Sequence, residues 1–157
     1  MPLEIERKFL VKSNPANLAE KSVHIRQGYL ARTTERTVRV RVAGDRGFLT
    51  IKGRPEKKHI TRFEWEVEIP LMDAEDLLRL CLPEIIDKRR HYISFGGHVF
   101  EVDVFYGDNR GLIIAEAELK SEDEEIQKPD WLGKEVTGDK RYYNAMLIKN
   151  PYKTWSK

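Results

Sequence analysis

Apolar and polar residues alternate along most of the chain with a repeat of two residues. In a β-strand this repeat places successive side chains on opposite faces of the sheet, so the pattern predicts half-buried strands. The predicted strands span residues 3–11, 24–31, 36–43, 47–53, 61–70, 85–95, 98–106 and 112–120. Glycine and aspartate cluster between several of these segments, and connections this short favour antiparallel neighbours.

Two segments have a helical pattern instead. Residues 73–81 begin with Asp73 as a candidate N-cap and continue with three leucines, and a second helix is predicted from about residue 140 to 148. Residues 14–20 predict a short helical turn. Eight strands with few helices are typical of a sheet that closes on itself. The sequence therefore predicts an α+β, mainly antiparallel β fold: an eight-stranded closed or nearly closed barrel with a few flanking helices.

Charged side chains share one face of most of the predicted strands. Arg39 and Arg41 alternate with valines in residues 36–43, and Glu64 and Glu66 alternate with apolar residues in residues 61–70. An antiparallel sheet with one solvated face would explain the alternation. Like charges side by side on one face repel each other, however, and a face made only for solvent more often mixes the signs. Separate clusters of both signs indicate a ligand that needs both.

The composition narrows the classes of ligand. The 157 residues fit a single domain spanning 1–157, and 28 basic residues against 26 acidic ones leave a net charge of only +2. This balance argues against nucleic-acid binding, for which a surplus of Lys and Arg is usual. Cys81 is the only cysteine, which excludes an intrachain disulfide, and no apolar run approaches the roughly 20 residues that cross a bilayer. We expect a cytoplasmic protein without membrane contact.

A metal-bound triphosphate needs charges of both signs. Hard divalent cations such as Mg²⁺ or Mn²⁺ take carboxylate oxygens, and phosphate oxygens pair with arginine and lysine. A barrel lined with these side chains would hold the metal on its acidic strands and the phosphates on its basic strands. The apolar faces would then point outward, where helices and loops, or the second subunit of a homodimer, must cover them.

Short charged motifs follow one another along the whole chain. They are Glu4-Ile5-Glu6-Arg7-Lys8, Arg26-Gln27-Gly28-Tyr29-Leu30, Arg39-x-Arg41, Thr50-x-Lys52, Glu64-x-Glu66, Lys88-x-Arg90, Glu101-x-Asp103, Glu116-x-Glu118 and Val136-Thr137-x-Asp139-Lys140-Arg141-Tyr142-x-Asn144. Through this ordered set the sequence resembles the CYTH superfamily, also called the triphosphate tunnel metalloenzymes, and in particular its short bacterial members. The first motif alone is weak, whereas the ordered set is specific.

The resemblance implies a CYTH-like tunnel that acts on a small-molecule triphosphate with Mg²⁺ or Mn²⁺. Carried over by position, the metal ligands would be Glu4, Glu6, Glu116 and Glu118, which with Lys8 would form the catalytic set. The phosphate-binding residues would be Lys8, Arg39, Arg41, Lys52, Lys88, Arg90 and Lys140. Further tunnel-lining residues would be Arg26, Glu64, Glu66, Glu101 and Asp103, with Glu64 and Glu66 on the wall facing the metal ligands.

The implied reaction is hydrolysis of tripolyphosphate to pyrophosphate and phosphate, with a second metal ion or the carboxylate of Glu116 or Glu118 orienting the water. The same resemblance extends to class IV adenylate cyclases and thiamine triphosphatases, so these activities stay open as alternatives. A non-catalytic protein that binds polyphosphate or nucleotides is an alternative of another class. The acidic residues favour an enzyme over such a protein, because anion binding alone needs only cations.

Overall fold

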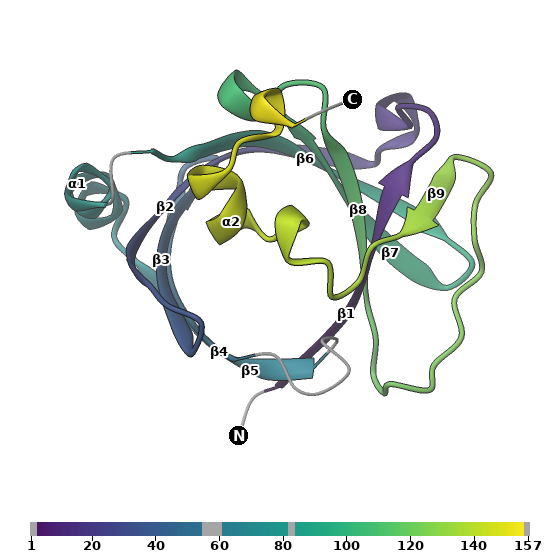
Figure 1. Ribbon diagram of the computed structural model, residues 1–157, viewed down its shortest axis with the longest axis horizontal. Coiled ribbons are helices and arrows are strands. Elements are labelled where there is room, and N and C mark those ends of the chain that lie inside the picture. Colours follow the sequence, from purple (N-terminus) through teal and green to yellow (C-terminus); the bar gives the residue numbers. More distant parts are fainter. Residues whose placement is uncertain (1–2, 55–60, 82–83, 156–157) are drawn as a thin grey trace.

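Eight strands close into an antiparallel barrel within the part of the chain that the computed structural model describes, which is residues 3–54, 61–81 and 84–155. Figure 1 looks down the barrel. The strands in chain order are β1 (Leu3–Val11), β2 (Lys21–Arg32), β3 (Arg36–Ala43), β4 (Arg46–Gly53), β5 (Thr61–Ile69), β6 (Ile86–Phe95), β7 (His98–Phe105) and β8 (Ile113–Glu118). Their spatial order is β5-β4-β3-β2-β6-β7-β8-β1, and β1 pairs with β5 to close the ring.

The predicted strands are confirmed, with boundaries that shift by up to three residues. A further strand, β9 (Leu132–Glu135), pairs with β1 outside the barrel. It was not predicted because four residues are too few to show a repeat. Helix α1 (Leu71–Leu80) confirms the first predicted helix, but the N-cap prediction is wrong, because Pro70 holds that position and Asp73 lies in the first turn. A single 3₁₀ turn over Ala16–Leu18 lies within the predicted turn at 14–20. Further 3₁₀ turns lie at Gly107–Asn109, Lys140–Tyr142 and Tyr152–Thr154.

The prediction of one continuous C-terminal helix over residues 140–148 is wrong, because the segment is interrupted at Tyr143. The 3₁₀ turn over Lys140–Tyr142 is followed by Tyr143 in an extended conformation, with φ −71° and ψ 136°, and α2 (Asn144–Lys149) begins after it. The Asp139 side chain accepts a hydrogen bond from the Arg141 backbone N–H, which caps the turn. The ring of Tyr143 lies against the ammonium of Lys8 inside the barrel. The break therefore aims one side chain of this segment at the barrel interior.

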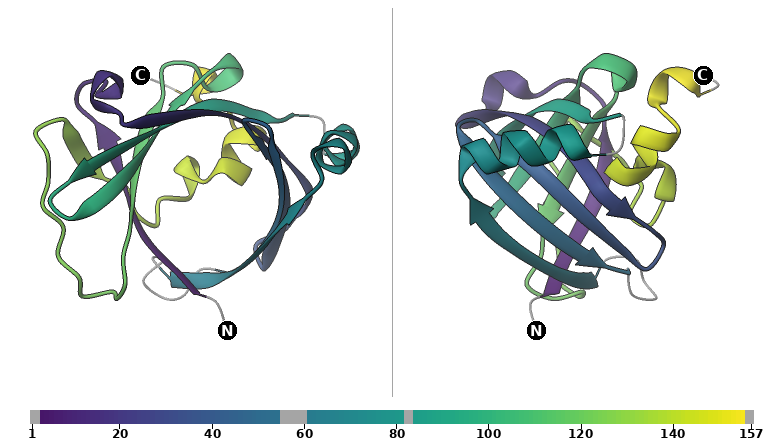
Figure 2. Two further views of the ribbon diagram at one scale, coloured as in Figure 1. Left: turned by 180° about the vertical axis from the view of Figure 1, so that it is seen from behind. Right: turned by 90° about the vertical axis from the view of Figure 1, so that its left-hand side faces the viewer.

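The apolar faces of the strands point outward and are covered by the chain itself, as the charge pattern requires. Helix α1 lies across β2, β3 and β4, where Val40 and Val42 pack against Ala74 and Leu78 (Figures 1 and 2). On the other side, β9 and the segment before it cover a second cluster made of Phe9, Ile93, Phe100, Val102, Ala115, Ala117, Trp131 and Leu132. The outer face of β5 stays partly open, since Trp65 is 43% exposed. No helix in the described ranges is long and apolar enough to span a membrane.

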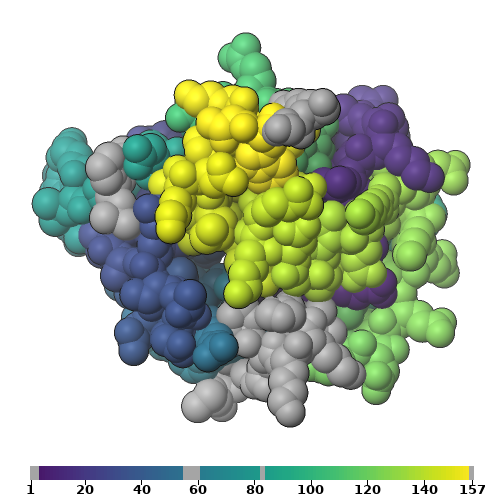
Figure 3. Space-filling model, in the orientation of Figure 1, coloured from purple at the N-terminus to yellow at the C-terminus, as the bar shows by residue number. Residues whose placement is uncertain are grey.

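A third apolar cluster lies within the barrel at one end. Leu147 and Ile148 of α2 pack there against Ile86, Phe105 and Ile114, whose side chains share the inward parity of the charged residues on the same strands. Figure 1 shows α2 across this opening, and Figure 2 shows the C-terminal segment at one end of the barrel. In Figure 3, residues of this segment spread over the middle of the same end. The C-terminal segment therefore narrows one end of the barrel.

The contact between α1 and β4 depends on a glycine. A Cβ atom at Gly47 would lie 2.5 Å from the Cβ of Ala74, which is far closer than two carbons approach. We expect Gly47→Ala to lower the free energy of unfolding by about 1–3 kcal/mol, because the helix must move away from the strand. Urea denaturation measures this loss. The double variant with Ala74→Gly should recover part of it, and additive losses in the two single variants would contradict the proposed contact.

Candidate active site

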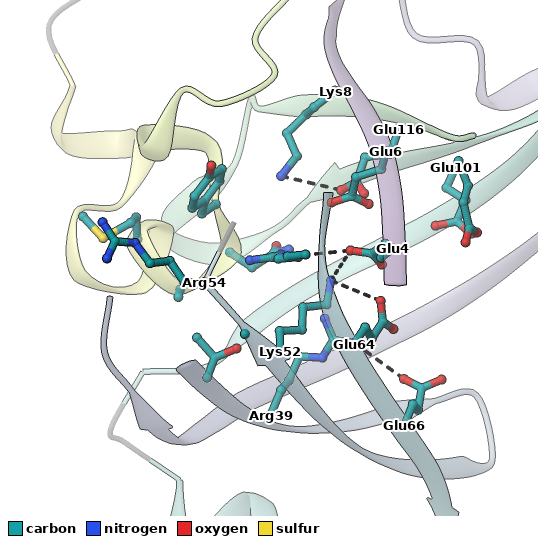
Figure 4. A pocket seen from close by; sticks show the side chains of 18 of the residues that line it. Glu4, Glu6, Lys8, Arg39, Lys52, Arg54, Glu64, Glu66, Glu101 and Glu116 are labelled. Carbon is teal, nitrogen blue, oxygen red and sulfur yellow. Dashed lines mark hydrogen bonds and ion pairs between the residues drawn. The ribbon is translucent and has the colours of Figure 1, made fainter. Parts of the chain in front are cut away.

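A cavity of about 1090 Å³ runs through the barrel interior. Its size suits a small ligand together with bound water. Its lining includes charged side chains of both signs, and every strand of the barrel contributes at least one of them. Figure 4 shows part of this lining. The predicted site residues that line it are Glu4, Glu6, Lys8, Arg39, Arg41, Lys52, Glu64, Glu66, Arg90, Glu101, Glu116, Glu118 and Lys140.

Two carboxylates lie against each other on neighbouring strands β1 and β8. Burial raises the pKa of Glu6 well above its usual value, and the adjacent Glu116 raises it further. Burial alone would also raise the pKa of Glu116, but Lys8 and the hydrogen bond from Glu6 hold it well below its usual value. The Nζ of Lys8 is 3.8 Å from Glu116 (Figure 4). Glu118 lies beside them at the exposed rim, directly opposite Glu6 in the strand register. Of the two, Glu6 is therefore the carboxylate that takes up a proton first as the pH falls.

Lys52 joins the acidic residues of β1 and β5. Its Nζ lies 2.9 Å from Glu4 and 3.8 Å from Glu64, and Figure 4 shows it between the two. Because β5 closes the barrel against β1, Glu64 lies beside the predicted metal ligand Glu4, whereas Glu66 lies further along β5, 3.7 Å from Arg39. The expectation of a place on the facing wall is therefore wrong for Glu64. Chain order alone does not show that the fifth strand returns to the first.

The remaining cations line the wall of β3 and β6. Arg39 lies 3.7 Å from Glu66 and donates a hydrogen bond to the Thr50 hydroxyl. Arg41 donates from Nε to the amide oxygen of Gln27 at 3.1 Å. Arg90 donates two hydrogen bonds to the Asp103 carboxylate, from Nε at 2.7 Å and from Nη2 at 2.9 Å. These arginines face a space bounded on its other side by the acidic residues of β1 and β8.

Two of the predicted site residues, Lys88 and Asp103, lie inside the barrel but do not line the cavity. Lys88 is fully buried, with its Nζ 2.7 Å from Asp103 and 3.3 Å from the Asn144 side chain. Burial lowers the pKa of Lys88 to about 7, which the Asp103 carboxylate only partly offsets. Neither Lys88 nor Asp103 is among the residues that line the cavity. The expectation that Asp103 lines the tunnel is therefore not met, and the contact of Lys88 with phosphate stays a prediction.

Arg26 lies on the wrong face of β2 to line the tunnel. Its Nη2 donates to both oxygens of Glu75 on α1, at 3.0 and 2.8 Å, outside the barrel. Tyr29, which has the opposite parity, lines the cavity. The expectation for Arg26 is therefore wrong, since the strand's inward side chains are Ile25, Gln27 and Tyr29. The sequence pattern of this strand did not reveal its parity, because its inward side chains are uncharged.

A family model, described as the CYTH domain, matches residues 2–144. The chain belongs to the CYTH domain family. An inorganic triphosphatase of Acetivibrio thermocellus is 47% identical over 156 residues, which are 99% of this chain and 99% of that relative. An inorganic triphosphatase of Nitrosomonas europaea is 37% identical over 148 residues, 92% of this chain and 95% of that relative. A solved structure of an inorganic triphosphatase aligns at 37% identity with a TM-score of 0.68, covering 94% of this chain and 95% of that one.

Several residues of this CYTH cavity were not singled out from the sequence. Arg62 on β5 approaches Glu4 at 3.8 Å, and its guanidinium lies over the ring of Tyr143. A basic group lines the cavity near the C-terminal segment, made of Arg32, Arg36, Arg54, Lys140 and Lys149. Arg62 lies two residues before Glu64 and therefore on the same face of β5 as the acidic residues. This position in the alternating pattern could have identified it as a tunnel-lining residue. The basic group comes from separate segments and has no signal in the sequence.

The acidic residues of this CYTH chain fit a divalent cation that shares its coordination with a ligand. In the ranges covered by the structure, no three His, Cys, Asp or Glu side chains converge closely enough to hold a metal ion alone. The Glu6–Glu116 pair nevertheless places hard oxygen donors side by side in a buried site, where a cation would relieve the repulsion between the two carboxylates. Mg²⁺ is commonly held by one or two carboxylates, water and substrate phosphate rather than by a complete protein cage. The donor set therefore suits a hard cation brought together with phosphate.

Proposed function

We propose that this chain is a metal-dependent triphosphatase that hydrolyses inorganic tripolyphosphate to pyrophosphate and phosphate. The observation that carries the proposal is the meeting of an acidic pair and a wall of arginines and lysines in one cavity. An anion of high charge is attracted by the cations, and the carboxylates have a use only if a cation accompanies that anion. The triphosphatase relatives of the CYTH family support the same activity.

We assign the metal ion, Mg²⁺ or Mn²⁺, to the carboxylates on β1 and β8. Glu6 and Glu116 would hold it, with Glu4 and Glu118 on either side, directly or through water. When bound, the ion supplies charge neutralisation of the phosphate oxygens and a lowered pKa of coordinated water. Since no three carboxylates converge in the described part of the chain, we expect metal affinity to increase when triphosphate is present.

The cationic residues have separate tasks in this proposal. Arg39, Arg41 and Arg90 point into the cavity from β3 and β6 and would bind equatorial phosphate oxygens, for which the planar guanidinium is well shaped. Lys52 and Lys8 lie against acidic residues and would bind phosphate at the border of the metal site. Lys140, near one end of the cavity, would contact the end of the phosphate chain. Phosphoryl transfer depends mainly on such positioning and charge stabilisation.

A carboxylate beside the metal site would orient the attacking water. Glu118 suits this task because it lies at the rim, opposite Glu6 in the strand register, where water can enter. Burial raises the pKa of Glu118, and Glu4 and Glu101 raise it further, which favours its acceptance of a proton. Glu116, held below its usual pKa by Lys8, is better suited to remain a metal ligand.

The activity is tested by incubating the full chain with tripolyphosphate, ATP and thiamine triphosphate in Mg²⁺ or Mn²⁺. We expect pyrophosphate and phosphate in equal amounts from tripolyphosphate, turnover that stops with EDTA, and lower kcat/KM for the organic triphosphates. Cyclic AMP is measured in the ATP reactions. Formation of cyclic AMP faster than phosphate release, or no phosphate release from tripolyphosphate with either metal, would refute the proposal.

A further inference from the structure

Gln27 occupies a buried position on β2 next to the cationic wall of the cavity. Its strand register places it directly opposite Arg41 on β3, and its side chain is fully buried. Tyr29, two residues later and therefore on the same side of β2, lines the cavity. Gln27 thus lies beside Arg41, which lines the cavity, without itself being part of the lining.

The orientation of the Gln27 amide is fixed by its partner. Arginine has only donors, so the group that receives the Arg41 Nε–H at 3.1 Å is the amide oxygen. The amide nitrogen of Gln27 is buried and has no hydrogen-bond partner among the described residues. A buried donor without an acceptor lowers stability, and an apolar side chain here would avoid that loss. The presence of a polar residue here, despite this loss of stability, indicates a role for Gln27 beyond packing.

Arg41 differs from Arg39 and Arg90 in how its charge is balanced. Arg90 is paired with Asp103 and lies 3.0 Å from Glu101, and Arg39 lies 3.7 Å from Glu66. No carboxylate of the described ranges approaches Arg41 within 4.0 Å. Burial lowers the pKa of Arg41 to about 9, and the cations of Arg39 and Arg90 contribute to the shift. Its guanidinium stays charged at neutral pH, but nothing nearby neutralises it fully.

We propose that Gln27 is a positioning residue that aims Arg41 at the phosphate chain of the ligand through a neutral acceptor. A carboxylate at this place would orient Arg41 equally well but would also neutralise it. The amide orients the guanidinium and leaves its full charge for the phosphates. This inference rests on the proposed triphosphatase function, because it assumes an anionic ligand in the cavity.

The variant Gln27→Glu separates orientation from charge, since it keeps the shape and the acceptor but adds a negative charge. We expect KM for tripolyphosphate to rise about 10- to 100-fold, the scale of one hydrogen bond between charged groups, with a smaller change in kcat. The unfolding temperature should be no lower than that of the wild type, because the new carboxylate pairs with a cation that is already buried. Gln127→Glu, the same change at an exposed position, is the control and should leave KM unchanged.

A purely structural role for Gln27 predicts the opposite combination, which is a lower unfolding temperature and an unchanged KM. That result would overturn the proposal. Gln27→Met removes the acceptor without adding charge, and we expect kcat/KM to fall about 100-fold as Arg41 loses its orientation. If Gln27→Glu does not fold, Gln27→Met decides the matter, and an unchanged kcat/KM in the folded variant would overturn the proposal.

A double-mutant cycle tests whether Gln27 acts through Arg41. In an Arg41→Met background, Gln27→Glu should have little further effect on KM, whereas equal effects in both backgrounds would overturn the proposal. Calorimetric binding of tripolyphosphate to the same variants separates this inference from the proposed function. A wild-type chain that binds tripolyphosphate without hydrolysing it would refute the function, and the change in Kd for Gln27→Glu would still test the role of Gln27.

Discussion

Glu6→Gln is expected to lower kcat/KM for metal-dependent tripolyphosphate hydrolysis by roughly 10³-fold or more, the scale seen when one essential member of a catalytic set is removed. The amide can donate to Glu116 as the protonated carboxyl does, so the barrel should stay folded. What is lost is the ability to release a proton and present a second anionic oxygen to the metal ion. The measurement is phosphate release over a range of Mg²⁺ and Mn²⁺ concentrations, with circular dichroism as the check on folding.

Glu135→Gln is a matched control for this variant. Glu135 accepts two hydrogen bonds from Arg7 on the outer side of β1, at 2.9 and 2.6 Å, on the opposite face of the strand from Glu6. It should keep the wild-type kcat/KM. A folded Glu6→Gln variant with full metal-dependent activity would remove Glu6 from the proposed metal site.

Asp103→Asn is expected to lower the free energy of unfolding at pH 7 by between about 2 and about 5 kcal/mol. The side chain of Asp103 is 2% exposed and lies 2.7 Å from both Lys88 and Arg90. The asparagine keeps the shape but leaves the buried Lys88 without its counter-charge and Arg90 with Glu101 alone, which is the costly way to break a buried ion pair. Urea denaturation measures the difference. Asp87→Asn, on the outer side of β6 in an exposed pair with His24, should change stability by less than about 1 kcal/mol.

The Asp103 carboxylate also makes the free energy of unfolding depend on pH in the acidic range. Burial alone would raise the pKa of Asp103, but Arg90 and Lys88 outweigh it and lower the pKa to about 2, from an ordinary value of 3.8. Since the unfolded chain binds the proton first, the stabilisation is complete above about pH 4 and is lost as the pH falls towards 2. Asp103→Asn should lack this part of the pH dependence. Parallel stability curves for the two proteins between pH 5 and pH 2 would contradict the assignment.

Much of the barrel could be predicted from the sequence because its strands alternate strictly. Glu4 and Glu6 in β1, Arg39 and Arg41 in β3, and Glu116 in β8 lie at every second position, and all of them line the cavity. An alternating strand has only two faces, so a row of charges on one face must point either to solvent or to a shared interior. The repulsion between like charges on one face favoured a shared interior over solvent. This argument did not require knowing which strands are adjacent in the sheet.

Which strands stand next to each other was decided by the tertiary structure. The pairing of β1 with β5 brings Glu64 beside Glu4, and the pairing of β6 with β7 joins Lys88 to Asp103 beneath the cavity. In β2, Gln27 and Tyr29 point inward and are uncharged, so the charge pattern did not show that Arg26 points outward, where it pairs with Glu75. These outcomes depend on register and on closure of the sheet.

By itself, then, the sequence determined that this protein places charged residues of both signs on one face of seven of its eight predicted strands. Only the tertiary structure decided which of those charges remain open to a ligand and which neutralise each other. The physical reason is that alternation is a local property of one strand. The partner of a buried charge, by contrast, is set by contacts between residues far apart in the chain.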